Sequence, residues 1–214
     1  MKAFVLMFNR LTWALPLIEK LAEKCDVILI DNGSTYQPLL DWYKTCPYQL
    51  MQMGNDRVSN LKSVLNTFKP DRYILTDHDL DISSVPENWL LQLEKGLNLY
   101  PNASKCGLSL ELMDLPVNRF TERVFDHECR FWMHRDKYFY HADVATTLAL
   151  HDAGRHEAGM RNGIRSARPY TARHLPWYMN RDTIMESEEE LYYIAHATNY
   201  GWSNVAREIF NIKS

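Results

Sequence analysis

The fold is decided by the stretch Tyr73-Ile74-Leu75-Thr76-Asp77-His78-Asp79-Leu80-Asp81, in which an apolar run ends in three carboxylates spaced two residues apart. A short strand that ends in Asp-X-Asp places its acids at the carboxyl edge of a sheet, where open α/β folds keep their ligand crevice. Mg²⁺ and Mn²⁺ are commonly bound by one or two protein carboxylates together with substrate phosphate oxygens. The stretch therefore predicts a site for a metal ion and a diphosphate.

Three other interpretations compete for the same acids. An EF-hand calcium loop would need a glycine at Ile82 and a bidentate glutamate at Asn88, and neither is present. A phosphatase of the haloacid-dehalogenase type also places Asp-X-Asp after a strand, but such enzymes resemble this chain poorly, because two strand-and-helix units precede the acids here. The third interpretation is a solvated acidic loop that caps the next helix. The flanking chain has to decide among them.

The bulk composition indicates one globular unit of 214 residues, since 46% of them are hydrophobic. A net charge of −3 gives no field that would attract nucleic acid or an anionic membrane. The apolar run 3–8 is too short for a signal peptide or a membrane span, so we expect a cytoplasmic protein without membrane insertion. The four cysteines are scattered, which predicts reduced thiols and no structural zinc.

The first half of the chain alternates apolar runs with helical patterns. Strands are expected at 3–8, 26–31, 48–53 and 73–76. Helices are expected after Thr12 as a cap, near 39–43, with one face formed by Val58, Leu61, Leu65 and Phe68, and from Pro86 onward. Continuous apolar strands joined by helices predict parallel pairing with right-handed crossovers.

The second half changes character. A strand is expected at 106–112 and a β-rich segment at 138–150, whereas 114–137 shows no clean period. The segment 154–173 carries five arginines against Glu157 alone and is predicted to be a mobile basic loop. Ser187 and Glu190 form a capping-box pattern that predicts the start of a late helix.

Four ordered pieces of the first half together resemble the GT-A glycosyltransferases, in the manner of the family-2 enzymes. The pieces are Phe8-Asn9-Arg10, Ile30-Asp31-Asn32-Gly33-Ser34-Thr35, the segment 54–60, and Asp77-His78-Asp79. The segments 142–147 and 173–178 also look like the small glycosyltransferase domain encoded by chlorella viruses. The resemblance implies a GT-A fold, a Rossmann-like mixed sheet flanked by helices, as one domain over 1–214. Residues 1–100 would form the nucleotide-binding half and 101–214 the half that binds the acceptor and completes the metal site.

The resemblance also implies an activity: metal-dependent transfer of a hexose or deoxyhexose, glucose or rhamnose, from a UDP-sugar to a carbohydrate acceptor. Mn²⁺ or Mg²⁺ would be held by Asp77, Asp79 and His174. Residues that would bind the nucleotide sugar are Phe8, Asn9, Arg10, Asp31, Arg57, Asn60, Asp77 and His78. Asp31 can accept the imide N–H of uracil, and it can equally initiate the Asn-Gly turn that follows it.

Asp143 is the first candidate for chemistry on the sugar, because it interrupts an apolar β-rich segment where a buried carboxylate is unfavourable unless bonded or functional. It would deprotonate the acceptor hydroxyl or flank the anomeric carbon. A hydrogen bond at a strand end is the structural alternative. Glu111 is the second candidate base. A phosphotransferase of the haloacid-dehalogenase type and a non-catalytic module that binds nucleotide sugars stay open as alternative functions.

Overall fold

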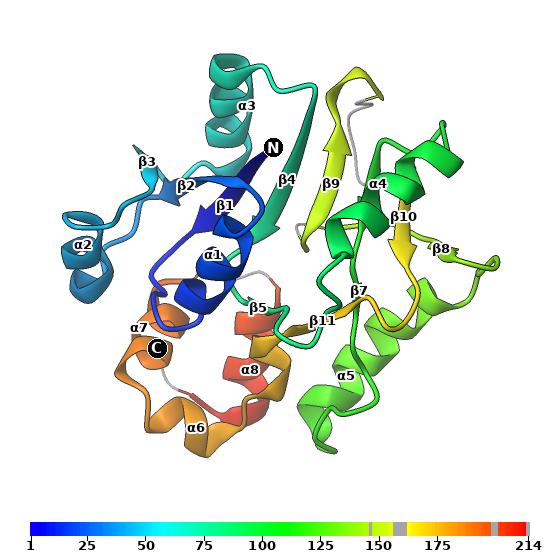
Figure 1. Ribbon diagram of the computed structural model, residues 1–214. Helices are drawn as coiled ribbons and strands as arrows, with labels where there is room; N and C mark the ends of the chain where they lie inside the picture. Colours follow the sequence, from blue (N-terminus) through cyan, green and yellow to red (C-terminus); the bar gives the residue numbers. More distant parts are fainter. Residues whose placement is uncertain (146, 156–161, 198–200, 213–214) are drawn as a thin grey trace.

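The computed structural model describes residues 1–145, 147–155, 162–197 and 201–212. In the first half, strands and helices alternate along the chain (Figure 1). The elements are β1 (Lys2–Met7), α1 (Ala14–Ala22), β2 (Asp26–Asn32), α2 (Gln37–Tyr43), β3 (Gln49–Met53), α3 (Arg57–Phe68), β4 (Arg72–Asp77) and α4 (Trp89–Leu99). Each predicted apolar run therefore forms a strand.

The second half consists of short strands and helices. Its strands, with β5 just before α4, are β5 (Leu80–Asp81), β6 (Lys105–Gly107), β7 (Ser109–Leu110), β8 (Phe139–His141), β9 (Ala149–Asp152), β10 (Gly163–Ser166) and β11 (Thr171–His174). Its helices are α5 (Arg119–Glu128), α6 (Arg181–Met185), α7 (Glu188–His196) and α8 (Trp202–Phe210), with 3₁₀ turns at Cys129–Trp132, Ala153–Arg155 and Leu175–Tyr178. None of the described helices has the length and apolarity to cross a membrane.

The described strands form an eight-stranded sheet in the order β3-β2-β1-β4-β9-β6-β10-β8. The first four strands are parallel, as predicted for strands joined by helices. β9 then runs antiparallel to both β4 and β6, and β8 runs antiparallel to β10. A mixed sheet flanked by helices agrees with the α/β architecture that the sequence predicted.

Two apolar layers cover the faces of the sheet. Along β1, Ala3, Val5 and Met7 point into the larger core, which α1, α2 and α4 complete. Phe4 and Leu6 point to the other face, into the smaller core under α3. Alternate residues of a strand face opposite sides, so both faces of this parallel strand are buried and its apolar run is continuous.

The strand register sets the position of the candidate site. Met7 of β1 pairs with Asp31 of β2, and Leu6 pairs with Asp77 of β4. The carboxyl ends of these three parallel strands therefore reach the same edge of the sheet, where the loop after β1 also begins. This is the edge at which α/β sheets hold ligands.

A small second sheet brings late residues to this edge. Among the described residues it has the order β5-β11-β7, and β11 runs antiparallel to β5 with His174 opposite Leu80. Leu80 directly follows Asp79 in the sequence, so this pairing places His174 next to Asp79. The ribbon in Figure 1 shows β11 crossing between the two halves of the molecule.

The second half differs from its sequence prediction at one strand and contains one helix that the sequence pattern did not indicate. The expected strand 106–112 is divided into β6 and β7, which belong to different sheets. The segment without a clean period contains α5, whose N-terminus is closed by a reciprocal capping box between Asn118 and Thr121. The buried face of α5 includes Thr121 and Glu128 beside Phe120 and Val124, so a search for apolar residues at helical spacing does not find it.

Other expectations changed in detail. Trp13, without a side-chain cap, precedes α1, and the backbone N–H of Thr12 instead donates to Glu189. Of the predicted inward face of α3, Leu61, Leu65 and Phe68 pack against the smaller core, whereas Val58 is exposed. Asn60 and Val64 are also buried.

The basic segment expected to be mobile contains β10 and most of β11, although Glu157 and Arg161 lie outside the described residues.

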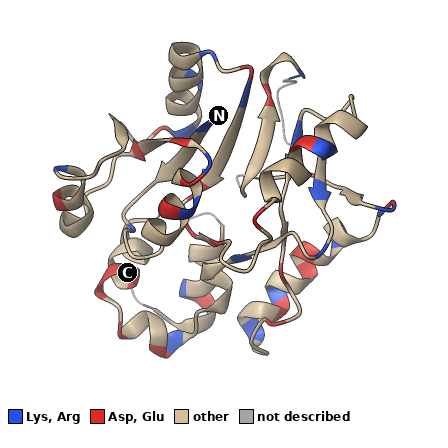
Figure 2. Ribbon diagram, viewed as in Figure 1, with Lys and Arg blue, Asp and Glu red and all other residues tan. Residues whose placement is uncertain are grey.

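Figure 2 shows acidic and basic residues interspersed in both halves of the chain. The cap predicted at Ser187 is confirmed, because its side chain accepts from the backbone N–H of Glu190.

Candidate active site

A carboxylate and an imidazole meet at the carboxyl edge of the sheet. Asp79 follows β4, and His174 ends β11; the distance from Asp79 Oδ1 to His174 Nε2 is 3.5 Å. Asp79 Oδ1 and His174 Nδ1 are buried, and neither has a hydrogen-bond partner among the described residues. Buried polar atoms without partners are rare in folded proteins, and an unplaced ion is one of the usual reasons.

The protonation states of this pair suit a cation. Burial lowers the pKa of His174, and the charge of Arg10 lowers it further, so the imidazole is neutral at pH 7. Burial by itself raises the pKa of Asp79, but His174, His78 and Arg10 together hold it below the ordinary range. An ionised carboxylate and a neutral imidazole both present lone pairs to a metal ion.

The pair does not form a complete metal shell. Within the described residues, no three His, Cys, Asp or Glu side chains converge closely enough to hold an ion. Mg²⁺ and Mn²⁺ usually retain water and take phosphate oxygens beside one or two protein ligands. The donors Asp79 and His174 fit that pattern, in which a bound diphosphate would complete the shell.

Arg10, expected near the phosphates, is enclosed by protein groups. Its Nη2 lies 2.6 Å from Glu190 Oε2, its Nε donates to Glu190 Oε1, and its Nη1 lies 3.2 Å from Asp79 Oδ2. The guanidinium carbon is 3.4 Å from the ring centroid of Tyr193. Arg10 is only 2% exposed, so its guanidinium group holds Asp79 in position and is not available to bind a ligand directly.

His78 is buried and lines neither of the two cavities at the acidic edge. Its Nδ1 lies 2.8 Å from the carbonyl oxygen of Leu6, and its ring packs edge-on against Tyr193. Burial lowers the pKa of His78 to about 4, so the ring is neutral. The side chain therefore connects the start of the acidic loop to β1.

Other residues predicted to bind the nucleotide hold the loops around the site. Asp31 accepts hydrogen bonds from Ser34 and from the hydroxyl of Tyr43 at 3.0 Å, which is the turn-forming role considered for it. Asn60 donates to Asn32 Oδ1 and to the carbonyl of Gly54.

Asn9 has a positive φ of 48° and is fully buried. Its Oδ1 accepts from the backbone N–H groups of Thr35 and Tyr36, so it joins the loops that follow β1 and β2.

Two cavities meet at the acidic edge. The smaller, of about 220 Å³, is lined by residues that include Phe8, Arg10, Arg57 and Asp79. The larger, of about 700 Å³, lies against the second half of the chain. Three residues line both cavities: Asp77, His174 and Trp202.

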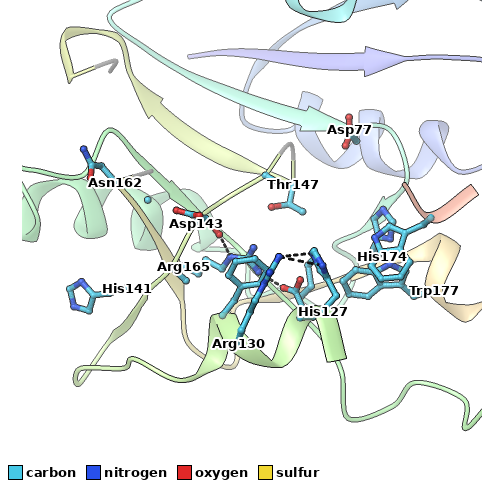
Figure 3. A pocket seen from close by; sticks show the side chains of 17 residues that line it. Asp77, His127, Arg130, His141, Asp143, Thr147, Asn162, Arg165, His174 and Trp177 are labelled. Carbon is cyan, nitrogen blue, oxygen red and sulfur yellow. Dashed lines mark hydrogen bonds and ion pairs between the residues drawn. The ribbon is translucent and has the colours of Figure 1, made fainter. Parts of the chain in front are cut away.

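The larger cavity contains Asp143 but not Glu111. Asp143 lines its wall (Figure 3), but it is exposed and lies outside the strands, so the expectation of a buried carboxylate was wrong. Its backbone carbonyl accepts from Arg165 Nε at 2.6 Å. Glu111 pairs with Arg168 and accepts from Thr171 and from two backbone N–H groups. Burial alone would raise the pKa of Glu111, but these bonds keep it below its ordinary value. Of the two candidate bases, Asp143 therefore lies in the larger cavity and Glu111 lies outside it.

The sequence prediction missed several residues of this cavity. His127 and Arg130 come from the end of α5 and the turn after it, and Trp202 begins α8. The pair Asn118 and Thr121 forms a capping box at the start of α5, and this pattern is recognisable in the sequence. A helix predicted from it would have His127 in its last turn. No comparable sequence pattern marks Trp202.

The chain is similar to two solved structures over part of its length. No protein-family model matches the chain, and no curated protein matches its sequence. The chain is similar to the solved structure of glucosyl-3-phosphoglycerate synthase from Mycobacterium tuberculosis in complex with phosphoglyceric acid, with a TM-score of 0.46 and 11% identity over 71% of this chain and 56% of that one. It is also similar to the bifunctional IspDF from Campylobacter jejuni, with a TM-score of 0.37 and 15% identity over 55% of this chain and 35% of that one. Similarity at this level gives no information about activity.

Proposed function

We propose that this protein is a metal-dependent glycosyltransferase that transfers a hexose or deoxyhexose, glucose or rhamnose, from a UDP-sugar to a carbohydrate acceptor. The observation that carries the proposal is the position of Asp79 and His174 at the junction of two cavities that share Asp77, His174 and Trp202. A diphosphate in the smaller cavity and an acceptor in the larger one would meet at this junction. The choice of uridine and of these sugars comes from the resemblance to family-2 enzymes and to the viral domain.

In the smaller cavity, Asp79 and His174 would hold Mn²⁺ or Mg²⁺, a Lewis acid that neutralises charge on the departing diphosphate. Arg57 lines the same cavity and adds a positive charge near the phosphates. Arg10 and Glu190 keep the Asp79 carboxylate oriented. A preorganised charge arrangement of this kind stabilises the transition state without further movement of the protein.

In the larger cavity, Asp143 would accept the proton of the attacking acceptor hydroxyl, or flank the anomeric carbon in a retaining reaction. The volume of about 700 Å³ is within the usual range for ligand sites. Trp177 and Trp202 lie 5.7 Å apart, centroid to centroid, and present aromatic surface at the end near His174. Such surface suits the apolar face of a sugar ring.

The first test is calorimetric titration with UDP in the presence and absence of Mn²⁺. We expect tight binding only with the metal, and weaker binding of CDP and GDP. Asp79→Asn should abolish the metal-dependent part, whereas the matched variant Asp81→Asn should retain it, because Asp81 lines neither of the two cavities. Equal UDP binding without metal, or in Asp79→Asn, would contradict the proposal.

A second test separates an enzyme from a binding module. Incubation with a panel of UDP-sugars and mixed carbohydrate acceptors should release UDP from one or a few donors. Release of inorganic phosphate without a need for uridine would instead support the phosphotransferase. Analysis of the anomeric configuration of the product would then show whether Asp143 acts as a base or flanks the anomeric carbon.

A further inference from the structure

Two arginines and a histidine gather around one aromatic ring on the wall of the larger cavity. The guanidinium carbons of Arg130 and Arg165 lie 4.7 and 4.1 Å from the centroid of the Phe131 ring. The His127 ring is 5.7 Å from the same centroid, and Arg130 Nη2 is 3.3 Å from His127 Nδ1. Figure 3 shows these side chains side by side in the cavity with Asp143 nearby.

One of the two arginine charges has no carboxylate paired with it. Arg165 is 2% exposed and forms a buried ion pair with Glu128. Asp143 interacts electrostatically with both Arg165 and Lys105. Arg130 forms no direct ion pair among the described residues, although the Glu128 carboxylate also interacts with it electrostatically.

The titration of His127 reflects the same excess of positive charge. Burial lowers its pKa, and the charges of Arg130 and Arg165 lower it further. Like charges held this close repel each other unless an anion lies among them. Guanidinium groups that converge on one place match the oxygens of phosphate and carboxylate groups.

We infer that Arg130 and His127, which are exposed to the larger cavity in front of the buried Arg165–Glu128 pair, form a subsite for an oxyanion, a phosphate or carboxylate group carried by the acceptor. The inference rests on the proposed function for the identity of the acceptor, but the anion site itself does not depend on it. The subsite, Asp143 and His174 line one continuous cavity. An acceptor anchored by its anion would therefore present a hydroxyl between Asp143 and the metal-binding edge.

Direct binding of inorganic phosphate is the first test. The Arg130→Gln variant removes the charge that lacks a carboxylate partner, and Arg123→Gln is its matched control, an exposed arginine on α5 that does not line the cavity. Titration followed by the NMR signals of the His127 ring should show saturable binding that is weakened at least about fivefold in Arg130→Gln, as expected for the loss of a charge-assisted hydrogen bond. Arg123→Gln should bind like the wild type. Equal binding in all three proteins would overturn the inference.

The source of the anion is tested by competition. Phosphate binding is measured again with saturating UDP and Mn²⁺ present. If the acceptor supplies the anion, the phosphate signal at His127 should persist. Displacement of phosphate by UDP would mean that the donor's diphosphate occupies these cations, and the acceptor subsite would be rejected.

Transfer assays complete the test. With the donor found in the panel, glucose 6-phosphate and glucuronic acid are compared with glucose as acceptors. Arg130→Gln should lower kcat/KM for at least one anionic acceptor about tenfold more than it lowers the value for glucose, because the anion contacts Arg130. The same loss for glucose would contradict the subsite. If no UDP-sugar is turned over but phosphate binding still depends on Arg130, the proposed function fails and the anion site stands.

Discussion

The Nη2 atom of Arg10 lies 2.6 Å from Oε2 of Glu190, so a residue just after β1 is ion-paired with a residue of α7 near the end of the chain. The side chain of Glu190 is 5% exposed and that of Arg10 is 2% exposed. Arg10 also reaches Asp79, while the neighbouring Glu189 accepts from the backbone N–H groups of Leu11 and Thr12. Helix α7 thereby holds both the loop after β1 and the acid that we propose binds metal.

Replacement of Glu190 by Gln should destabilise the protein by about 3 kcal/mol, since removal of one partner leaves a buried charge poorly compensated. Urea unfolding measures the change. Glu186→Gln, an exposed position just before α7, is the control and should change stability by less than about 0.5 kcal/mol. We also expect weaker Mn²⁺ binding in Glu190→Gln, because Arg10 no longer holds Asp79. Wild-type stability in this variant would show that the pair is unimportant.

Asp143→Asn should lower kcat for sugar transfer at least about 100-fold, the usual contribution of a general base. Its UDP affinity in the presence of Mn²⁺ should be unchanged, because Asp143 does not line the smaller cavity. Glu111→Gln should retain transfer, since Glu111 pairs with Arg168 outside both cavities. Single-turnover kinetics on the two variants check this, and loss of transfer in Glu111→Gln alone would reverse the assignment.

Gly96→Ala should destabilise the protein by about 1 to 2 kcal/mol, although alanine is the better helix former. A Cβ at Gly96 would lie 2.5 Å from Cys106 Sγ and 3.0 Å from Phe139 Cε1, because α4 packs closely on the sheet. Gly54→Ala is the control, as a Cβ there would meet no atom within 4 Å. Thermal unfolding of both variants tests the close packing, and equal melting temperatures would argue against it.

Tyr73 should make stability fall at high pH. Burial raises the pKa of Tyr73 to about 12, above the unfolded value of about 10. The neutral phenol is therefore favoured by folding, and its contribution is complete below pH 10 and lost as the pH rises toward 12. Between pH 9 and 11 the wild type should lose about 1 kcal/mol more than Tyr73→Phe. Parallel pH dependences of the two unfolding free energies would contradict the buried position of the hydroxyl.

The sequence alone determined the parallel half of the fold. Apolar runs such as Ala3 to Met7 can be buried on both faces only in a parallel sheet covered by helices, and the local pattern contains that information. The acids Asp77 and Asp79 were likewise found from their position at the end of such a run. These are local properties, because they depend on neighbours within a few residues.

Tertiary structure decided which of the candidate residues come together. Pairing of β11 with β5 brings His174 close to Asp79. Arg10 is ion-paired with Glu190, and Glu111 is ion-paired with Arg168 outside the two cavities. The convergence of Arg130 and Arg165 on one ring depends on the ion pair between Glu128 of α5 and Arg165 of β10 and on the turn Cys129–Trp132 that carries Arg130, and no spacing in the sequence encodes it. Contacts between distant segments are set by the packing of buried surfaces and by the pairing of buried charges, neither of which a linear pattern records.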